Sequence, residues 1–308
     1  MKAILLHLGT NLWYDFESKV HTSDKLFQCP ADHKMRFDND FFHEYTEKLA
    51  KLGFNTIVLD LADGVVYNSH PEIAVEGAWS VDQLKREIER LNKMGITVMP
   101  KLNFSTTHDV WLGDYARMVS TPIYYKVCRD LIDEVCEIFK PEYLHIGMDE
   151  ETYDMQRLYD YVTVRQNDLW WHDLYYFVEC VERHGARACM WSDYARHKPD
   201  EYVEKCPKSV VQCTWYYFNE FYGDLDEHHR IRVYPFHIIE KHGFDQFPTA
   251  SYEYFKDNVV KLHEFCEGAL AEERYLGIMQ TAWVATTEAW RKSHEEAAEI
   301  AATIWNKD

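Results

Sequence analysis

The 308-residue sequence lacks any apolar run long enough to cross a membrane as a helix, which needs about 18 or more such residues. It is also poor in basic residues, because 33 Lys and Arg stand against 52 Asp and Glu and give a formal net charge of −19. Nucleic acids and anionic membrane surfaces bind basic faces. We therefore expect neither as a partner, and the charge is compatible with a neutral substrate.

The sequence also lacks a CxxC pair and the spacing typical of zinc ligands. Residues 1–9 contain one basic residue and an apolar run too short for a signal peptide, and they predict a first strand instead. Without an export signal, we expect reduced thiols in the core, no disulfide framework and a cytoplasmic location. The eight cysteines are residues 29, 128, 136, 180, 189, 206, 213 and 266.

No stretch rich in proline, glycine or serine divides the chain, and strand patterns alternate with helix patterns along its length. Strands that read as continuous apolar runs between helices predict a parallel sheet covered by helices. Eight strands predict a closed barrel, so we expect a single (β/α)8 TIM barrel over residues 1–308, with a doubly wound open sheet as the alternative. The predicted strands are 3–8, 54–60, 96–102, 143–146, 187–191, 209–215, 230–236 and 277–283.

Helix starts are marked by two local signals. Residues 80–83 read Ser-Val-Asp-Gln, which is typical of a capping box, and Thr121-Pro122 places proline where its missing N–H costs nothing. The main predicted helices are 40–52, 81–94, 122–138, 168–184, 252–270 and 288–305.

The active site of such a barrel forms at the carboxyl ends of its strands. Several carboxylates and many tryptophans and tyrosines fall there, a combination that suits sugars and the hydrolysis of glycosides by paired acids. The strand ends supply Asp60, Asp63, Asn103, His108, Asp149, Glu150, Trp191, Asp193, Trp215, Tyr216, Tyr217, Tyr234, His237, Gln280 and Trp283.

The stretch 143–151 is the centre of this prediction. A short apolar strand leads through Gly147 to Asp149 and Glu150, and adjacent acids at the end of a buried strand are costly unless something uses them. The alternative is that they only supply negative charge at a helix start, which is how we interpret the following Glu151. We interpret His145 as a residue that supports the acid pair from within the strand.

Residues 145–150, His-Ile-Gly-Met-Asp-Glu, resemble the His-x-Gly-Gly-Asp-Glu signature of glycoside hydrolase family 20, the β-N-acetylhexosaminidases. Residues 99–103, Met-Pro-Lys-Leu-Asn, together with His108 resemble that family's third strand and the histidine after it. Residues 190–193, 212–215 and 277–283 resemble its later tryptophan motifs. The resemblance runs in order from about residue 54 to 283.

The resemblance implies a reaction and roles. Glu150 would be the general acid that protonates the leaving oxygen and later activates water, and Asp149 would orient the substrate's own 2-acetamido group for attack on the anomeric carbon. Trp191, Trp215 and Trp283 would surround the sugar. The candidate substrate-binding residues are His108, Asn103, Trp191, Asp193, Trp215, Tyr217, Tyr234, His237, Gln280, Trp283, Asp60 and His145.

The sequence departs from the family at three positions. No arginine follows the first strand in residues 7–13, where the family holds the outer hydroxyls of a terminal sugar. Ala285 stands where the family has a glutamate, and Met148 replaces the second glycine of the signature. We therefore expect the reaction type to be kept and the sugar contacts to differ.

Two other functions remain open at this point. One is a metal-dependent barrel hydrolase or isomerase with Asp60, His108, His145 and Asp149 as ligands, although it lacks a His-x-His on the first strand. The other is a barrel that binds sugar without cleaving it. Our expectation is a glycosidase with a carbohydrate substrate and no cofactor or metal, and the sequence leaves open whether copies form a homo-oligomer.

Overall fold

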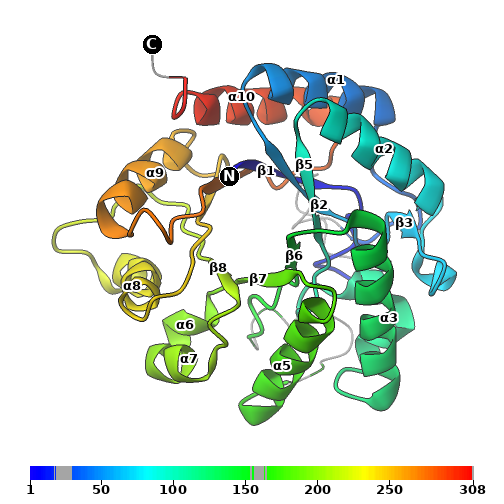
Figure 1. Ribbon diagram of the computed structural model, residues 1–308, viewed down its shortest axis with the longest axis horizontal. Helices are drawn as coiled ribbons and strands as arrows, with labels where there is room; N and C mark the ends of the chain where they lie inside the picture. The colour runs from blue at the N-terminus through cyan, green and yellow to red at the C-terminus, as the bar shows by residue number, and fades with distance from the viewer. Residues whose placement is uncertain (17, 19–29, 153–154, 156–162, 164, 307–308) are drawn as a thin grey trace.

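The computed structural model describes residues 1–16, 18, 30–152, 155, 163 and 165–306. Eight parallel strands lie at its centre and helices surround them (Figure 1). The strands are β1 (Lys2–His7), β2 (Thr56–Asp60), β5 (Thr97–Lys101), β6 (Tyr143–His145), β7 (Arg187–Trp191), β8 (Val211–Cys213), β9 (Thr249–Ser251) and β10 (Ile278–Thr281).

The strands pair in the order β8-β7-β6-β5-β2-β1-β10-β9, so the first strand lies between the second and the last. The two ends of this sheet also meet, because Trp215 just beyond β8 bridges Thr249 of β9 in parallel. The Phe247 amide donates to the carbonyl of Gln212 at 2.9 Å, and that of Thr249 donates to the carbonyl of Thr214 at 2.9 Å. The predicted (β/α)8 barrel is confirmed.

The helices form the outer ring that covers the strands (Figure 1). The two predicted helix starts are confirmed. The Ser80 hydroxyl accepts from the Gln83 amide, and Pro122 is the first residue of its helix, where the Thr121 hydroxyl accepts from the Tyr124 amide. The helices are α1 (Asn39–Lys51), α2 (Val81–Lys93), α3 (Pro122–Phe139), α5 (Asp168–Glu182), α6 (Tyr194–His197), α7 (Pro199–Lys205), α8 (Glu227–Lys241), α9 (Asn258–Ala269) and α10 (Arg291–Ala302).

Smaller elements lie in the loops, and apart from residues 288–290, which fall in a predicted helix, they were not predicted. The strands β3 (Val65–Val66) and β4 (Trp79–Ser80) pair in parallel after β2. Short 3-10 helices span Pro71–Ile73, Val110–Arg117 and Glu288–Trp290.

The predicted seventh strand is wrong. Residues 230–236 belong to α8, whose first turn is capped by the Asp226 side chain accepting from the His229 amide, and the seventh strand is β9. The alternation of apolar Ile231 and Val233 suits a strand, but the buried residues of α8 follow a helical stripe through Val233 and Phe236. Tyr234 and His237 therefore lie on a surface helix instead of at a strand end.

The core contains the thiols that the sequence placed there. Seven cysteines, at 128, 136, 180, 189, 206, 213 and 266, are buried and unbridged, and Cys29 lies outside the described residues. Among the described helices, none is long and apolar enough to cross a membrane.

Asp60 is not at the mouth of the barrel but inside it. Its carboxylate forms an ion pair with the Lys101 ammonium from the neighbouring strand β5, and both side chains are at most 1% exposed. Burial alone would raise the pKa of Asp60, but the adjacent Lys101 holds it below its ordinary value. Asp60 thus has a buried cation as its partner.

Replacing Lys101 by Met is expected to lower the free energy of unfolding by about 3–5 kcal/mol, because a buried carboxylate would lose its cation. Urea denaturation measures this change. The double variant Asp60→Asn, Lys101→Met should recover most of the loss, since a neutral amide needs no counter-ion. A double variant no more stable than Lys101→Met would contradict the assignment.

Candidate active site

The chain leaves β6 in a strained turn that brings Asp149 and Glu150 to the barrel mouth. Gly147, Met148 and Glu150 have φ of 76°, 73° and 51°, in the left-handed region. A Cβ at Gly147 would lie 1.9 Å from the Asn103 side-chain oxygen, so only glycine fits. Met148 takes the same backbone conformation as its glycine neighbour, at a cost of about 1–3 kcal/mol that the surrounding packing must offset.

Asp149 is held by the loop that follows β5. The Asn103 side-chain amide donates to its Oδ1 at 3.1 Å, and His108 Nδ1 lies 3.2 Å from the same oxygen. The Ser105 and Thr107 hydroxyls both donate to its backbone carbonyl. Four contacts thus fix both the carboxylate and the backbone of Asp149.

His108 lies between the two acids. Its Nε2 is 3.5 Å from Glu150 Oε2, while its Nδ1 faces Asp149. Burial alone would lower the pKa of His108, but the Asp149 and Glu150 carboxylates raise it to about 10. Burial of Asp149 alone would raise the pKa of this carboxyl group, but the His108 cation lowers it to about 2. His108 and Asp149 therefore form an ion pair near neutral pH.

Glu150 is positioned through its backbone and keeps its side chain toward the cavity. Its amide donates to Asp193 Oδ2 at 2.9 Å, from the loop after β7. Burial, reinforced by the nearby Asp149 and Glu150 charges and opposed by Arg196, raises the pKa of Asp193 to about 6. The Glu150 side chain is 33% exposed, against 13% for Asp149, so it has more room to reach a bound molecule.

A cavity of about 510 Å³ opens above these acids. The rings of Trp191 and Tyr217 lie 6.3 and 6.4 Å from the ring of Trp283, and that of Trp215 lies 5.0 Å from Tyr217. Aromatic faces around carboxylates are suited to a sugar ring. The lining residues are Trp13, Tyr14, His108, Asp149, Glu150, Met155, Trp191, Trp215, Tyr217, Phe218, His228, Arg232, Glu253, Tyr254 and Trp283.

Seven of the fourteen predicted site residues line this cavity, namely His108, Asp149, Glu150, Trp191, Trp215, Tyr217 and Trp283. Asn103 and Asp193 lie behind it and hold the acid loop. Asp60, His145 and Gln280 are buried in the barrel, with the His145 ring 4.4 Å from that of Trp191. Tyr234 and His237 are on α8 and do not line it, and Tyr234 is 46% exposed.

The sequence did not point to the other eight lining residues. Trp13 follows the first strand, and its ring meets those of His108 at 5.5 Å and Trp283 at 6.1 Å. Its place after a strand could have indicated it. The remaining seven include Glu253 and Tyr254, which follow β9, a strand that was not predicted, and the other five are Tyr14, Met155, Phe218, His228 and Arg232.

Glu151 is not a helix-opening charge at the surface. Its carboxylate pairs with the guanidinium of Arg165, which also lies 3.1 Å from Asp173 of α5. Arg165 Nη2 donates to the Phe104 carbonyl at 2.9 Å and lies 3.5 Å from the Met148 sulfur. The three charged side chains are at most 5% exposed, so a buried ion network supports the acid loop from behind.

The four metal ligands of the alternative hypothesis do not come together. Asp60 pairs with Lys101, and His145 Nδ1 accepts from the Gly147 amide at 3.1 Å. Among the described residues, one set with ligand atoms within 4.8 Å of one another is His108, Asp149 and Glu150, in the cavity, and another is the exposed group Asp226, His228 and His229. Elemental analysis of the purified protein tests whether either set holds a metal.

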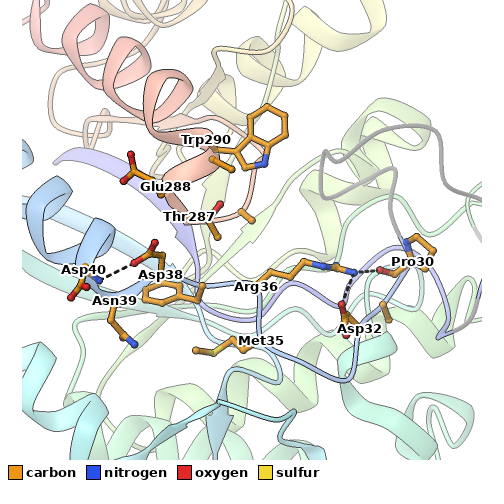
Figure 2. A pocket seen from close by; sticks show the side chains of 14 residues that line it. Pro30, Asp32, Met35, Arg36, Asp38, Asn39, Asp40, Thr287, Glu288 and Trp290 are labelled. Carbon is orange, nitrogen blue, oxygen red and sulfur yellow. Dashed lines mark hydrogen bonds and ion pairs between the residues drawn. The ribbon is translucent and has the colours of Figure 1, made fainter.

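A second, open hollow of about 1150 Å³ lies between the segment before α1 and the segment before α10. Figure 2 shows Trp290, Glu288 and Thr287 across this hollow from Asp38 and Arg36. Ala285 lines this hollow and not the catalytic cavity, and its carbonyl accepts from the His294 ring at 3.0 Å. The position at which the resembling family has a glutamate therefore offers no side chain to the cavity.

Residues 94–289 match the catalytic domain of glycosyl hydrolase family 20. A lacto-N-biosidase of Bifidobacterium bifidum is 24% identical over 132 residues, which are 38% of this chain and 12% of that protein. A β-N-acetylhexosaminidase structure from Bacteroides fragilis is 15% identical with a TM-score of 0.68, over 98% of this chain and 65% of that one. An N-acetyl-β-hexosaminidase structure from Streptomyces plicatus in complex with Thio-NAglucal is 13% identical, with a TM-score of 0.66. The match covers 98% of this chain and 63% of that one.

At these identities the solved structures establish the fold, and the chain spans less than two thirds of the length of each of these relatives. The family match carries more, because it covers over half of the chain and includes the strands from β5 to β10. It contains Asn103, His108, Asp149, Glu150 and the three strand-end tryptophans. The chain therefore belongs to glycosyl hydrolase family 20.

Proposed function

We propose that the protein is a glycosidase of the hexosaminidase type, which hydrolyses a 2-acetamido or similarly 2-substituted glycoside with retention at the anomeric carbon. The observation that carries the proposal is the division of the acid pair. Asp149 is fixed by His108 and Asn103 and stays ionised, while the neighbouring Glu150 is held through its backbone and has a longer side-chain contact to His108. Two adjacent acids can thus serve different atoms of one sugar.

In the proposed reaction, the carbonyl oxygen of the substrate's acetamido group attacks the anomeric carbon while Glu150 protonates the departing oxygen. Asp149 accepts a hydrogen bond from the acetamido N–H, which turns the carbonyl toward the reacting carbon and stabilises the positive charge that develops on the ring. Water then opens this cyclic intermediate, and Glu150 takes its proton. Trp191, Trp215 and Trp283 line the cavity. In the proposed reaction they surround the acetamido group and limit water there.

The relatives support this substrate class, since two of the similar structures are those of hexosaminidases. The contacts to the outer hydroxyls of the sugar differ in this chain. Trp13 lines the cavity after β1, where the family's arginine is absent, and Ala285 faces away from the cavity. We therefore propose the reaction and the 2-acetamido requirement without a specific sugar.

The test is a panel of aryl glycosides that differ only at the 2-position. A 2-acetamido glycoside should be cleaved at least about 100-fold faster in kcat/KM than its 2-hydroxyl counterpart, because the hydroxyl analogue lacks the attacking group. Equal rates on the two, or turnover of the 2-hydroxyl compound alone, would reject the proposal.

Replacing His108 by Gln is expected to move the acid limb of the kcat/KM profile to higher pH. The cation that lowers the pKa of Asp149 to about 2 would be gone, and burial would push this pKa back toward or above 3.8. A pH–rate profile measures the shift. His43→Gln, on the exposed face of α1, is the control and should leave the profile unchanged.

The same variant has a predicted stability signature. Asp149 contributes stability above pH 3.8 that is lost as pH falls toward about 2, and His108 contributes stability below pH 6.5 that is lost as pH rises through about 10. The difference in unfolding free energy between wild type and His108→Gln should therefore be largest between about pH 4 and 6.5. A difference that does not depend on pH would contradict the ion pair.

A further inference from the structure

Two arginines lie together on the α8 side of the catalytic cavity. Arg232 of α8 lines the cavity, and its Nη1 donates to the His228 carbonyl at 2.8 Å. Arg196 of α6 lies behind it, with its guanidinium 3.6 Å from the centre of the Trp215 ring and its Nη2 donating to the Trp215 carbonyl at 2.8 Å. The cation–π contact places Arg196 directly against a lining residue of the cavity.

Neither arginine has an ion-pair partner among the residues that the structure describes, and Arg196 Nε is buried without an acceptor. Elsewhere in the molecule Arg183, Arg274 and Arg291 each pair with a carboxylate. Two arginines without an ion-pair partner among the described residues thus lie at this wall of the cavity.

The acids near this wall form no ion pair with Arg196 or Arg232 among the described residues. Burial, followed by repulsion from Arg232, lowers the pKa of Arg196 to about 10, although Asp193 and Glu150 act in the opposite direction. Asp193 is already engaged by the Glu150 amide, and Glu253 is a further acid of the lining. His228 is also a lining residue, but burial and the nearby Arg232 lower its pKa, which favours its neutral form.

We infer that the substrate bears an anionic group, a carboxylate or a sulfate ester, which Arg232 binds with Arg196 behind it. The planar guanidinium fork matches both of these oxyanions and can donate two parallel hydrogen bonds. The inference rests on the proposed function, because it names the substrate class of the same cavity. The net charge of the chain is compatible with a neutral substrate, and the two arginines favour an anionic one instead.

The test compares matched pairs of substrates on wild type and on Arg232→Gln. The sulfate pair is an aryl N-acetyl-β-glucosaminide and its 6-sulfate. The carboxylate pair is an N-acetylhexosamine linked to a uronic acid and the same sugar linked to glucose. Arg230→Gln is the matched control, since it makes the same change at an exposed position of the same helix.

We expect Arg232→Gln to lower kcat/KM on the anionic member of at least one pair by roughly 10- to 100-fold, the effect of losing a hydrogen bond to a charged group. The neutral member should change by less than about threefold, and Arg230→Gln should change neither. The pair that responds identifies the anion. Equal losses on both members, or no loss on either pair, would overturn the inference.

Failure of the proposed function is distinguishable from failure of the inference. If wild type cleaves no 2-acetamido glycoside of either charge, the proposed function fails, and the inference is then tested by binding alone. Calorimetry with N-acetylglucosamine and its 6-sulfate should show a preference for the sulfate that Arg232→Gln removes and that added salt weakens. Turnover of the neutral substrates without any charge preference would leave the proposed function standing and reject the inference.

Discussion

Glu150→Gln is expected to lower kcat by roughly 10²- to 10⁴-fold on substrates with a poor leaving group, because the variant cannot donate a proton to the departing oxygen. KM should change little, since the amide has the size of the carboxyl group. The loss should be much smaller with a dinitrophenyl leaving group, which departs without a proton. Steady-state kinetics on the two substrate types measures this difference.

The matched control is Glu142→Gln. Glu142 is exposed and directly precedes β6, at the end of the strand opposite to the catalytic acids. It should leave both rates unchanged. An equal loss on the two leaving groups would mean that Glu150 acts in positioning and not in proton transfer, and an unchanged rate would remove it from the mechanism.

Arg165→Met is expected to lower the free energy of unfolding by about 3–5 kcal/mol, because Glu151 and Asp173 would remain buried without their cation. The acid loop should also lose its support, since Arg165 holds the Phe104 carbonyl and lies against Met148. Thermal or urea unfolding measures the stability, and kcat on an aryl glycoside shows whether the acid loop still positions Asp149 and Glu150.

Arg183→Met is the comparison for this prediction. Arg183 pairs with Asp133, but the two side chains are 40% and 32% exposed, so solvent screens the pair. Its loss should cost no more than about 1 kcal/mol. Similar costs for the two variants would show that the Arg165 network does not carry the stability that its burial indicates.

The barrel was predictable because each parallel strand is buried on both faces and reads as a short apolar run between amphipathic helices. The exception is instructive. β9 has only three residues, Thr249–Ser251, and carries little signal, whereas residues 230–236 alternate like a strand but lie in α8. The wrongly predicted strand 230–236 and the real strand β9 both lie between the sixth and the eighth strand in the sequence. The predicted number of eight strands was therefore still correct.

The residues of the catalytic cavity were also predictable only where they follow a strand that the sequence predicts. Residues that directly follow a strand, such as Asp149, Glu150 and Trp191, were predicted because strand ends converge in a barrel. Arg232 was not, because it lies in helix α8 and reaches the cavity through tertiary packing, and Tyr254 was not, because the strand before it, β9, was missed. The same holds for Arg165, which supports the acid loop from 14 residues further along the chain.

Met148 shows how a departure from a motif can leave its geometry intact. The second glycine of the family signature is replaced, yet the backbone keeps φ of 73°, next to a true glycine at 76°. The buried Met148 side chain contacts Arg165, which gives the loop a link to the ion network that a glycine could not make. The acid pair is therefore presented despite the altered signature.

The central claim is that the substrate's own acetamido group is the nucleophile, and its most direct test is to weaken that group alone. In a series of aryl glycosides with acetyl, monofluoroacetyl, difluoroacetyl and trifluoroacetyl groups on the 2-nitrogen, each fluorine makes the carbonyl oxygen a poorer nucleophile with little change in size. If the acetamido group is the nucleophile, log kcat/KM should fall steeply and linearly along the series. A rate that is independent of fluorination would contradict it and would assign the attack to a group of the protein or to water.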